Sequence, residues 1–235
     1  CNICVTGDMT MSLSRCTQNS SFMEEWRKGW HPERIAAAGS KDTVLVVGAG
    51  YTGLHAALQT ARGGRSTLVV DAEEAGWGCS TRNGGQISTS IKPSFDQLAK
   101  RHGPERAFGI LREGQQSLAW IAEFVRSEGI DCNFGQVGRF HAAHNAAQYE
   151  ALAGKLAKQP KGLEVKAHVV PRAEQRRELG SDVYWGGVVY EQHCSVHPAR
   201  YHQGLLERAL AAGVQVAPRC PASAIDKQGT QFRVT

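Results

Sequence analysis

One continuous run, Thr43 to Asp71, constrains the fold more than any other part of the chain. Thr43 to Val47 is a short β-branched apolar run of the kind that forms a strand buried on both faces. A helix is expected from about Tyr51 to Ala61, and a second strand from Ser66 to Val70. This strand, helix and strand, in that order, predict an α/β fold with a parallel sheet.

Three glycines join the first strand to the helix in the pattern G-x-G-x-x-G. Gly48 allows the tight turn, Gly50 lets backbone approach a pyrophosphate, and Gly53 lets the helix pack against the sheet. The N–H groups and positive dipole end of the helix then face the phosphates. The pattern predicts a Rossmann-like nucleotide site with these residues: Gly48, Gly50, Tyr51, Thr52 and Gly53.

The second expected strand ends at Asp71, about 20 residues beyond the last glycine, where a carboxylate binds a ribose hydroxyl. An acidic residue at this place favours an unphosphorylated ribose, so FAD or NAD is expected over NADP. The alternative is an ordinary glycine-rich turn between a strand and a helix. We favour nucleotide binding because strand, turn, helix and acid all occur in order.

The residues that follow decide between FAD and NAD. They read EAGWGCSTRNGGQIS from Glu74 to Ser88. Together with GAGYTGL, the run GWGCSTRNGGQ resembles the D-amino-acid-oxidase-like FAD-dependent oxidoreductases, particularly the branch near γ-glutamylputrescine oxidase. In that family the second motif lies along FAD. The resemblance therefore implies FAD contacts at these positions: Ser80, Arg82, Asn83, Gly84, Gly85 and Gln86.

The same resemblance implies an activity and its partners. The expected reaction is oxidation of a C–N bond of a small amine or amino acid by hydride transfer to flavin, with dioxygen or a dehydrogenase acceptor reoxidising the flavin. The flavin would supply the chemistry while the protein positions it. The alternative function class is an inactive FAD-binding fragment, and no catalytic residue is assigned.

Three cysteines, Cys1, Cys4 and Cys16, form a C-x-x-C pair followed by a longer gap, which suggests a metal or iron–sulfur site. The segment around them resembles the cluster-binding part of the trimethylamine dehydrogenase and dienoyl-CoA reductase group. By that resemblance they match three of four 4Fe-4S ligands. We do not expect an intact cluster, because incomplete thiolate coordination holds a cluster poorly, and a thiol-bearing tail is the favoured alternative.

Residues 1 to about 50 thus resemble one flavoprotein group and the following residues another, with the change inside VLVVGAG. One hypothesis is a recombined or misassembled reading frame, and the other is a natural fusion. The runner-up function is an iron–sulfur amine dehydrogenase, against which the motif GWGCSTRNGGQ argues after residue 50.

Downstream, the pattern remains α/β. Helices are expected at 94–102, 104–127 and around 146–157, and strands of a second sheet at 132–141, 164–170 and 183–190. The second helix carries an apolar stripe expected to face a core: Phe108, Leu111, Leu118, Ile121 and Val125. By family resemblance we expect a cysteine-bearing tail at 1–40, an incomplete FAD-binding domain at 41–92 and 197–235, a partial α+β substrate domain at 93–196, and a truncated chain.

Near the end, His197 and Pro198 begin an expected helix whose apolar side chains would pack on the nucleotide sheet: Leu205, Leu206, Ala209 and Leu210. His197 is a candidate base, but a helix-start role is favoured because no partner carboxylate is identifiable. A strand pair is expected from Val214 and Ala222, and the resemblance implies that Ala222 contacts adenine through its backbone.

Composition excludes several partners. The net charge is +5 with Lys and Arg scattered, so no nucleic acid partner is expected. No apolar run is long enough to span a bilayer, and no signal peptide is recognised. Seven cysteines without a disulfide pattern favour a cytoplasmic location.

Overall fold

The structure is a computed structural model that describes residues 43–89 and 93–235. The expected tail at 1–40 and the three cysteines in it lie outside the described residues. The described chain divides into two compact units, which are 43–84, 128–132 and 197–235 in the first, and 85–127 and 133–196, without the gap, in the second. Their assignment as FAD-binding and substrate domains stays a prediction.

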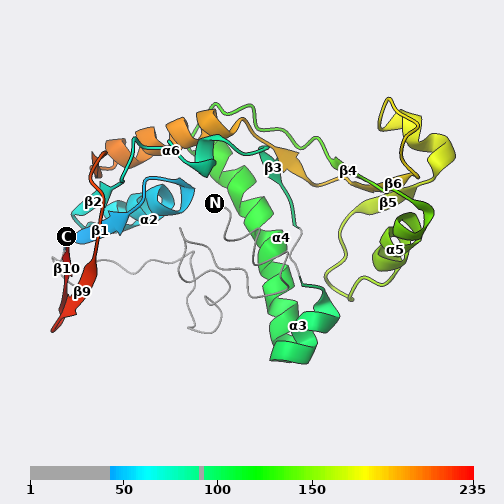
Figure 1. Cartoon of the computed structure of the whole chain (residues 1–235), viewed down its shortest axis with the longest axis horizontal. Coiled ribbons are helices and arrows are strands. Elements are labelled where there is room, and N and C mark those ends of the chain that lie inside the picture. Colours follow the sequence, from blue (N-terminus) through cyan, green and yellow to red (C-terminus); the bar gives the residue numbers. More distant parts are fainter. Residues whose placement is uncertain (1–42, 90–92) are drawn as a thin grey trace. The chain divides into compact units, whose positions relative to one another are not determined.

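The first unit is built on a parallel sheet of three strands, in the order β1 (Val44–Val47), β2 (Thr67–Val70) and β8 (Gln215–Ala217). Val44 pairs with Thr67, and Leu68 pairs with Gln215. Helix α2 (Tyr51–Arg62) connects the first two strands, as Figure 1 shows. The predicted parallel α/β unit is confirmed, with each element within a residue or two of its expected bounds.

The expectation that the first strand is buried on both faces is wrong. Val44 and Val46 are half-buried, whereas Leu45 and Val47 are 37% and 48% exposed. Val46 lies on the side of α2, since its Cγ1 atom is 3.3 Å from the place where a Cβ on Gly53 would lie. Alternate side chains of a strand point to opposite faces, so Leu45 and Val47 lie on the face away from α2.

Helix α6 (Pro198–Ala211) packs against α2 and against the short 3-10 turn η1 (Cys79–Thr81). His197 is its N-cap, with Nδ1 accepting the N–H of Arg200 at 3.3 Å, so the favoured helix-start role is confirmed. Of the four apolar residues expected to pack inward, Leu205 and Ala209 are fully buried and Leu206 is half-buried. Leu210 is 50% exposed, because it falls outside the buried stripe of the helix.

Beyond β8, the first unit ends in an antiparallel hairpin of β9 (Ile225–Gln228) and β10 (Gln231–Val234). Ala222 lies before this hairpin, half-buried in the loop between β8 and β9. The second strand of the expected pair therefore begins at Ile225 and not at Ala222.

The second unit contains two small antiparallel sheets. One pairs β3 (Gln86–Ile87) with β7 (Cys194–Ser195), and the other has the order β4 (Arg139–Ala142), β6 (Gly187–Tyr190) and β5 (Ala167–Val170). The helices of this unit are α3 (Phe95–His102), α4 (Pro104–Ser127) and α5 (Ala146–Ala157), and the 3-10 helix η2 covers Arg172–Arg177.

Local sequence explains where these helices begin. Ser94 and Gln97 form a reciprocal capping box at α3. Pro104 occupies the first position of α4, where its missing N–H costs nothing, and Glu105 follows it in the first turn. Asn145 accepts the N–H of Gln148 at the start of α5. The three predicted helices are therefore confirmed.

Two expectations about this unit need correction. The strand predicted at 132–141 is shortened to β4, because Asn133 and Gly138 adopt positive φ angles of 52° and 71° that interrupt an extended run. In α4, Val125 alone of the predicted stripe is buried, and the other four members are half-buried. The buried positions of the helix also include Ala107, Ile110 and Phe124, so the buried face is rotated from the expected one.

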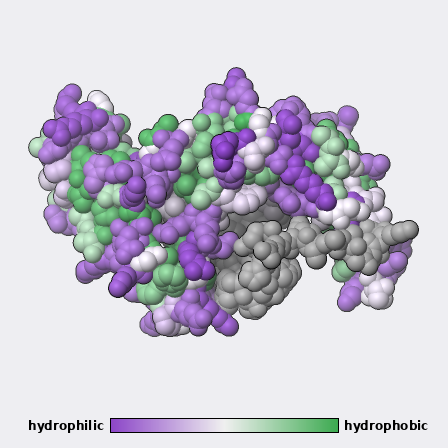
Figure 2. Space-filling view, turned by 180° about the vertical axis from the view of Figure 1, so that it is seen from behind, coloured by the Kyte–Doolittle hydropathy of each residue, from purple (hydrophilic) through white to green (hydrophobic). Residues whose placement is uncertain are grey.

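Hydrophilic and hydrophobic side chains are interspersed over the face shown in Figure 2. Among the described helices, none is both long and apolar enough to cross a membrane. Among the described residues, Cys194 is a buried free thiol and Cys220 an exposed one.

Two helical glycines should respond oppositely to alanine. A Cβ on Gly204 of α6 would lie 2.4 Å from Cγ2 of Ile130, so Gly204→Ala should lower the free energy of unfolding by about 1–3 kcal/mol. A Cβ on Gly109 of α4 would meet nothing within 4 Å, so Gly109→Ala should raise it by about 0.5–1 kcal/mol. Urea unfolding followed by circular dichroism measures both, and equal effects of the two substitutions would contradict the packing of α6 against Ile130.

Candidate nucleotide-binding site

The turn between β1 and α2 requires glycine at two places. Gly48 has a φ of +105°, which is accessible to glycine and strained for other residues. A Cβ on Gly53 would lie 1.8 Å from the carbonyl oxygen of Gly48, closer than any real contact. The first turn of α2 therefore lies directly against the backbone of the turn, as the sequence pattern predicts.

The peptide groups around Ala49 are held by two distant side chains. The Ala49 N–H donates to Oδ2 of Asp71 at 2.7 Å, and the Ala49 carbonyl accepts Nε2–H of His202 at 2.7 Å. Because a carbonyl only accepts, Nε2 of the buried His202 ring must carry a proton. Asp71 thus lies at the end of β2 as expected, and its carboxylate fixes the turn while also accepting the N–H of Glu73 at 2.9 Å.

The N-terminus of α2 is suited to an anion. Gly50 is its N-cap and offers no side chain, and the first turn contains no acidic residue to offset the positive end of the helix dipole. The Tyr51 N–H donates to Oγ of Ser80 at 3.1 Å, and Ser80 is buried. The structure therefore brings Ser80 to the predicted phosphate-binding turn from a segment 29 residues further along the chain.

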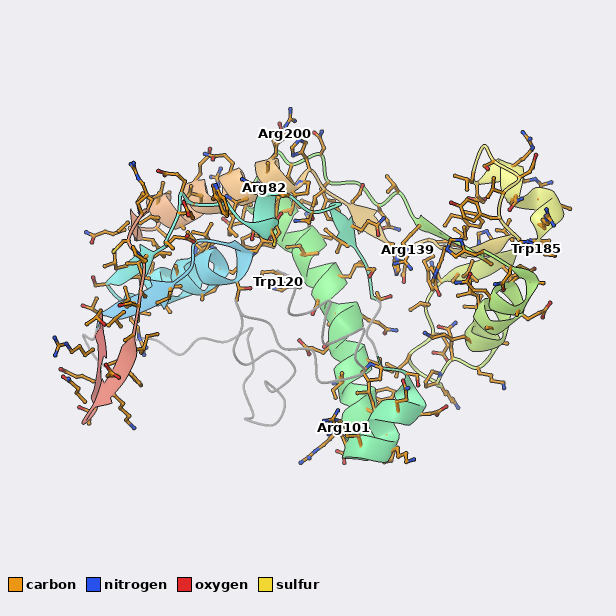
Figure 3. All side chains as sticks on the ribbon, viewed as in Figure 1. Arg82, Arg101, Trp120, Arg139, Trp185 and Arg200 are labelled. Atoms are coloured by element: carbon orange, nitrogen blue, oxygen red, sulfur yellow. The ribbon has the colours of Figure 1, made fainter. Side chains whose placement is uncertain are left out.

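Two further residues of the second motif, Arg82 and Asn83, lie near Ser80 in the first unit. Nδ2 of Asn83 donates to the carbonyls of Cys79 and Ser80 at 3.1 and 3.2 Å, and the guanidinium of Arg82 lies 4.8 Å from the Trp77 ring centroid. Figure 3 labels Arg82 beside η1. Gly84 is exposed, with nothing within 4 Å of a Cβ built there. Gly85 and Gln86 begin the second unit, so the structure does not bring the whole predicted set together in one unit.

Aromatic side chains of α2 and α6 pack together beside the start of α2. The rings of Tyr51 and Tyr201 meet edge to face at 5.1 Å, and Oη of Tyr51 donates to the carbonyl of Pro198 at 2.9 Å. The Tyr201 hydroxyl lies 2.6 Å from Nε2 of His55. Burial raises the pKa of both tyrosines and lowers the pKa of His55 to about 4, so all three side chains are neutral near pH 7.

Sequence reasoning missed His202 and the residue that receives it, Gly76. A Cβ on Gly76 would lie 2.6 Å from Cε1 of His202, and Gly76 has a φ of +81°. Gly76 is the first residue of the motif GWGCSTRNGGQ, but no role is predicted for it from the sequence. His202 lies 153 residues from Ala49, and no local pattern indicates a contact over that separation.

These residues fit the pyrophosphate and ribose part of FAD. The fit rests on the close approach of Gly53 to Gly48, the positive end of the α2 dipole with no acidic residue in its first turn, and the carboxylate at the end of β2. Within the described part of the chain, no group of three or more His, Cys, Asp or Glu residues is placed to hold a metal ion. Cys1, Cys4 and Cys16 lie outside it.

Together, the parallel sheet and the fixed glycine turn define a dinucleotide-binding protein. The model of the FAD dependent oxidoreductase family, DAO, matches residues 43–235. The chain belongs to this family, whose cofactor is FAD. This confirms the resemblance drawn from GAGYTGL and GWGCSTRNGGQ.

Known proteins support the same placement. The gamma-glutamylputrescine oxidoreductase of Escherichia coli (strain K12) is 32% identical over 158 residues, which are 66% of this chain and 36% of that protein. The crystal structure of glycine oxidase from Geobacillus kaustophilus has a TM-score of 0.70 at 14% identity, and the match covers 82% of this chain and 50% of that one. This structural likeness shows the fold.

A third relative bears on the runner-up interpretation. The dimethylamine dehydrogenase of Hyphomicrobium sp. (strain x) is 39% identical over 75 residues, which are 32% of this chain and 10% of that protein. The chain spans less than half the length of the curated relatives that match most of it, between 36% and 49%.

The half-buried His55 should make the first unit sensitive to acid. Its pKa is about 4 in the folded chain, chiefly through burial, against about 6.5 when unfolded. The unfolded chain therefore binds the proton more readily, and the stability that the neutral ring supports above pH 6.5 is lost as the pH falls towards 4. Between pH 7 and pH 4, wild type should lose about 3 kcal/mol more unfolding free energy than His55→Gln.

Urea unfolding at a series of pH values measures this difference. Tyr201→Phe is the matched control, since it removes the hydroxyl partner of His55 but keeps the ring buried, and it should retain the acid sensitivity. If His55→Gln loses as much stability on acidification as wild type, the burial of a neutral imidazole between α2 and α6 is contradicted.

Proposed function

We propose that this chain binds FAD mainly through its first unit and belongs to an enzyme that oxidises a C–N bond of an amine or amino acid by hydride transfer to the flavin. The observation that carries the proposal is the glycine turn, in which Gly53 touches the Gly48 carbonyl and Asp71 holds Ala49. Bound FAD supplies the acceptor for the hydride, while the protein binds and orients it.

Each site residue has a proposed role. The turn and the N-terminus of α2 bind the pyrophosphate, Asp71 accepts a ribose hydroxyl, and the second motif and the Ala222 backbone bind other parts of FAD. The glycines allow close approach of backbone, and Arg82 can pair with a phosphate. The proposed cofactor residues are Gly48, Gly50, Tyr51, Thr52, Gly53, Asp71, Ser80, Arg82, Asn83, Gly84, Gly85, Gln86 and Ala222.

The substrate class is supported by the relatives. The names of the matching proteins refer to gamma-glutamylputrescine and to glycine, which are an amine and an amino acid. We propose a small amine or amino-acid substrate and dioxygen or a dehydrogenase acceptor as the oxidant. We also propose a cytoplasmic location, because the sequence has seven cysteines without the pattern of a small disulfide-bonded domain.

A second candidate function is an iron–sulfur amine dehydrogenase, which the similarity to dimethylamine dehydrogenase favours. It would require Cys1, Cys4 and Cys16 to act as three of four cluster ligands, with a fourth from elsewhere. We place it second because the match to the FAD dependent oxidoreductase family covers residues 43–235.

FAD titration of the purified chain tests the proposed binding. Gly53→Ala places a Cβ on the Gly48 carbonyl, so it should weaken FAD binding at least tenfold, which is about 1.4 kcal/mol or more. Gly109→Ala is the matched control in α4 and should bind as wild type does. Arg82→Gln, which changes an exposed side chain, should also weaken binding and separates lost contact from lost folding. Equal FAD affinity in all four proteins would contradict the proposal.

Anaerobic mixing with amines tests the reaction itself. If the chain contains what the reaction requires, glycine or γ-glutamylputrescine should bleach the flavin absorbance of the FAD-loaded protein. Bound FAD that no amine or amino acid reduces would contradict an oxidase activity of this chain and leave a nucleotide-binding fragment.

A further inference from the structure

One dipeptide of the chain places a side-chain amide directly before a glycine. Asn83 is followed by Gly84, and no other Asn-Gly pair occurs in the 235 residues. Both residues are exposed, and they lie after η1 in a part of the described chain that is neither helix nor strand. The backbone nitrogen that follows an asparagine attacks the side-chain amide most readily when it belongs to glycine, because glycine has no Cβ to block the approach. The pair is therefore a candidate for spontaneous deamidation.

The attacking atom of this reaction, the backbone nitrogen of Gly84, is accessible. A Cβ built on Gly84 would meet nothing within 4 Å, so no neighbouring group crowds this backbone. Among the described residues, the Gly84 N–H forms no hydrogen bond that the attack would have to break. Asn145 differs, because its Oδ1 caps α5 by accepting the N–H of Gln148 at 2.8 Å, and the nitrogen that follows it is fixed in the first turn of that helix.

The amide of Asn83 has a structural role that requires its hydrogens. Nδ2 donates to the carbonyl oxygens of Cys79 at 3.1 Å and of Ser80 at 3.2 Å, which holds η1 closed. Ser80 in turn accepts the N–H of Tyr51 at the start of α2. An ionised carboxylate only accepts hydrogen bonds, so at this position it would face two carbonyl oxygens that also only accept. Loss of the amide nitrogen would therefore open the turn that brings Ser80 to α2.

We propose that Asn83 is a site of spontaneous deamidation and that its conversion weakens FAD binding. The Gly84 nitrogen forms a bond to Cγ of Asn83, and the bond between Cγ and Nδ2 breaks. Nδ2 leaves as ammonia and takes the proton of the Gly84 N–H, so that a succinimide ring remains. Water then opens the ring, with its hydroxyl adding to one of the ring carbonyl carbons and its proton going to the ring nitrogen. The product is aspartate or isoaspartate, and no oxidant or reductant takes part.

The effect on FAD rests on the proposed function. The new carboxylate adds a negative charge next to Ser80, and this charge repels the pyrophosphate that is proposed to bind at the start of α2. Bound FAD should in turn cover Asn83 and hold its turn closed, so deamidation should be slower in the FAD-loaded chain. Deamidation itself needs no FAD, so the modification site and the proposed function can fail separately.

Incubation of the full chain in water enriched in heavy oxygen, at mildly alkaline pH and a temperature at which it stays folded, tests the modification. Peptide mass spectrometry measures conversion at each asparagine, because the acid formed during the incubation contains one oxygen atom from the solvent. Asn83 should convert, whereas Asn145, the matched control, should remain an amide over the same time. Gly84→Ala gives Asn83 the same following residue that Asn145 has, and it should slow conversion at least about tenfold.

FAD titration of variants tests the consequence. Asn83→Asp reproduces one product and should bind FAD at least about tenfold more weakly than wild type. Asn145→Asp adds the same charge in the second unit, where aspartate also caps a helix, and it should bind FAD as wild type does. Asn83→Gln keeps the amide on a longer side chain that forms a ring far more slowly. Its FAD affinity should stay constant through the incubation, while that of wild type falls as Asn83 converts.

The opposite results would overturn the inference. An Asn83 that stays an amide throughout, conversion at Asn145 as fast as at Asn83, or equal FAD affinity of Asn83→Asp and wild type would each do so. Conversion of Asn83 in a chain that binds no FAD would confirm the modification site and contradict the proposed function alone. Conversion that FAD does not slow, in a chain that binds it, would confirm the modification site and contradict the role of Asn83 as a FAD contact.

Discussion

The peptide groups on either side of Ala49 are the point on which the nucleotide site depends. The carboxylate of Asp71 accepts the Ala49 N–H and the imidazole of His202 donates to the Ala49 carbonyl, each at 2.7 Å. The Ala49 N–H and carbonyl lie in a turn, where no strand or helix hydrogen bond pairs them. The two side chains supply the hydrogen bonds that these backbone groups need. The glycine turn is thereby held in one shape before any ligand binds, which lowers the ordering cost of binding.

The two side chains reach the turn from different elements, and this explains why separate parts of the sequence form one unit. Asp71 directly follows β2. Its backbone carbonyl accepts the N–H of Cys220, in the loop after β8, at 2.7 Å. His202 comes from α6, which packs on α2 through the contacts of the Tyr201 ring with Tyr51 and His55. A change in α6 packing, as at Gly204, is therefore expected to reach the cofactor turn although it touches no predicted FAD contact.

The sequence predicted those elements whose determinants are local. The strand, turn and helix from 43 to 71 follow from a β-branched run and three glycines, and the starts of α4 and α5 follow from Pro104 and the Asn145 cap. The family match also confirms the recognition of FAD from GAGYTGL and GWGCSTRNGGQ.

What escaped prediction depends on contacts between distant residues. The sequence predicted that Leu45 and Val47 are buried, but both are exposed in the structure. Burial of a strand residue depends on what covers its face of the sheet and not on the strand itself. The hydrogen bond from His202 to the Ala49 carbonyl joins residues 153 positions apart in the chain, and it has no local pattern. A single sequence carries no signal for such pairs.

The central claim is that the clamped turn binds the adenine dinucleotide part of FAD. Amide NMR of the chain titrated with ADP, which contains the ribose and pyrophosphate but no flavin, tests this most directly. We expect the largest shifts at the amides of Gly50, Tyr51 and Thr52 and at Asp71, with those of β4 and β6 unchanged. ADP that leaves the turn amides unshifted, or that shifts another part of the chain instead, would contradict the claim.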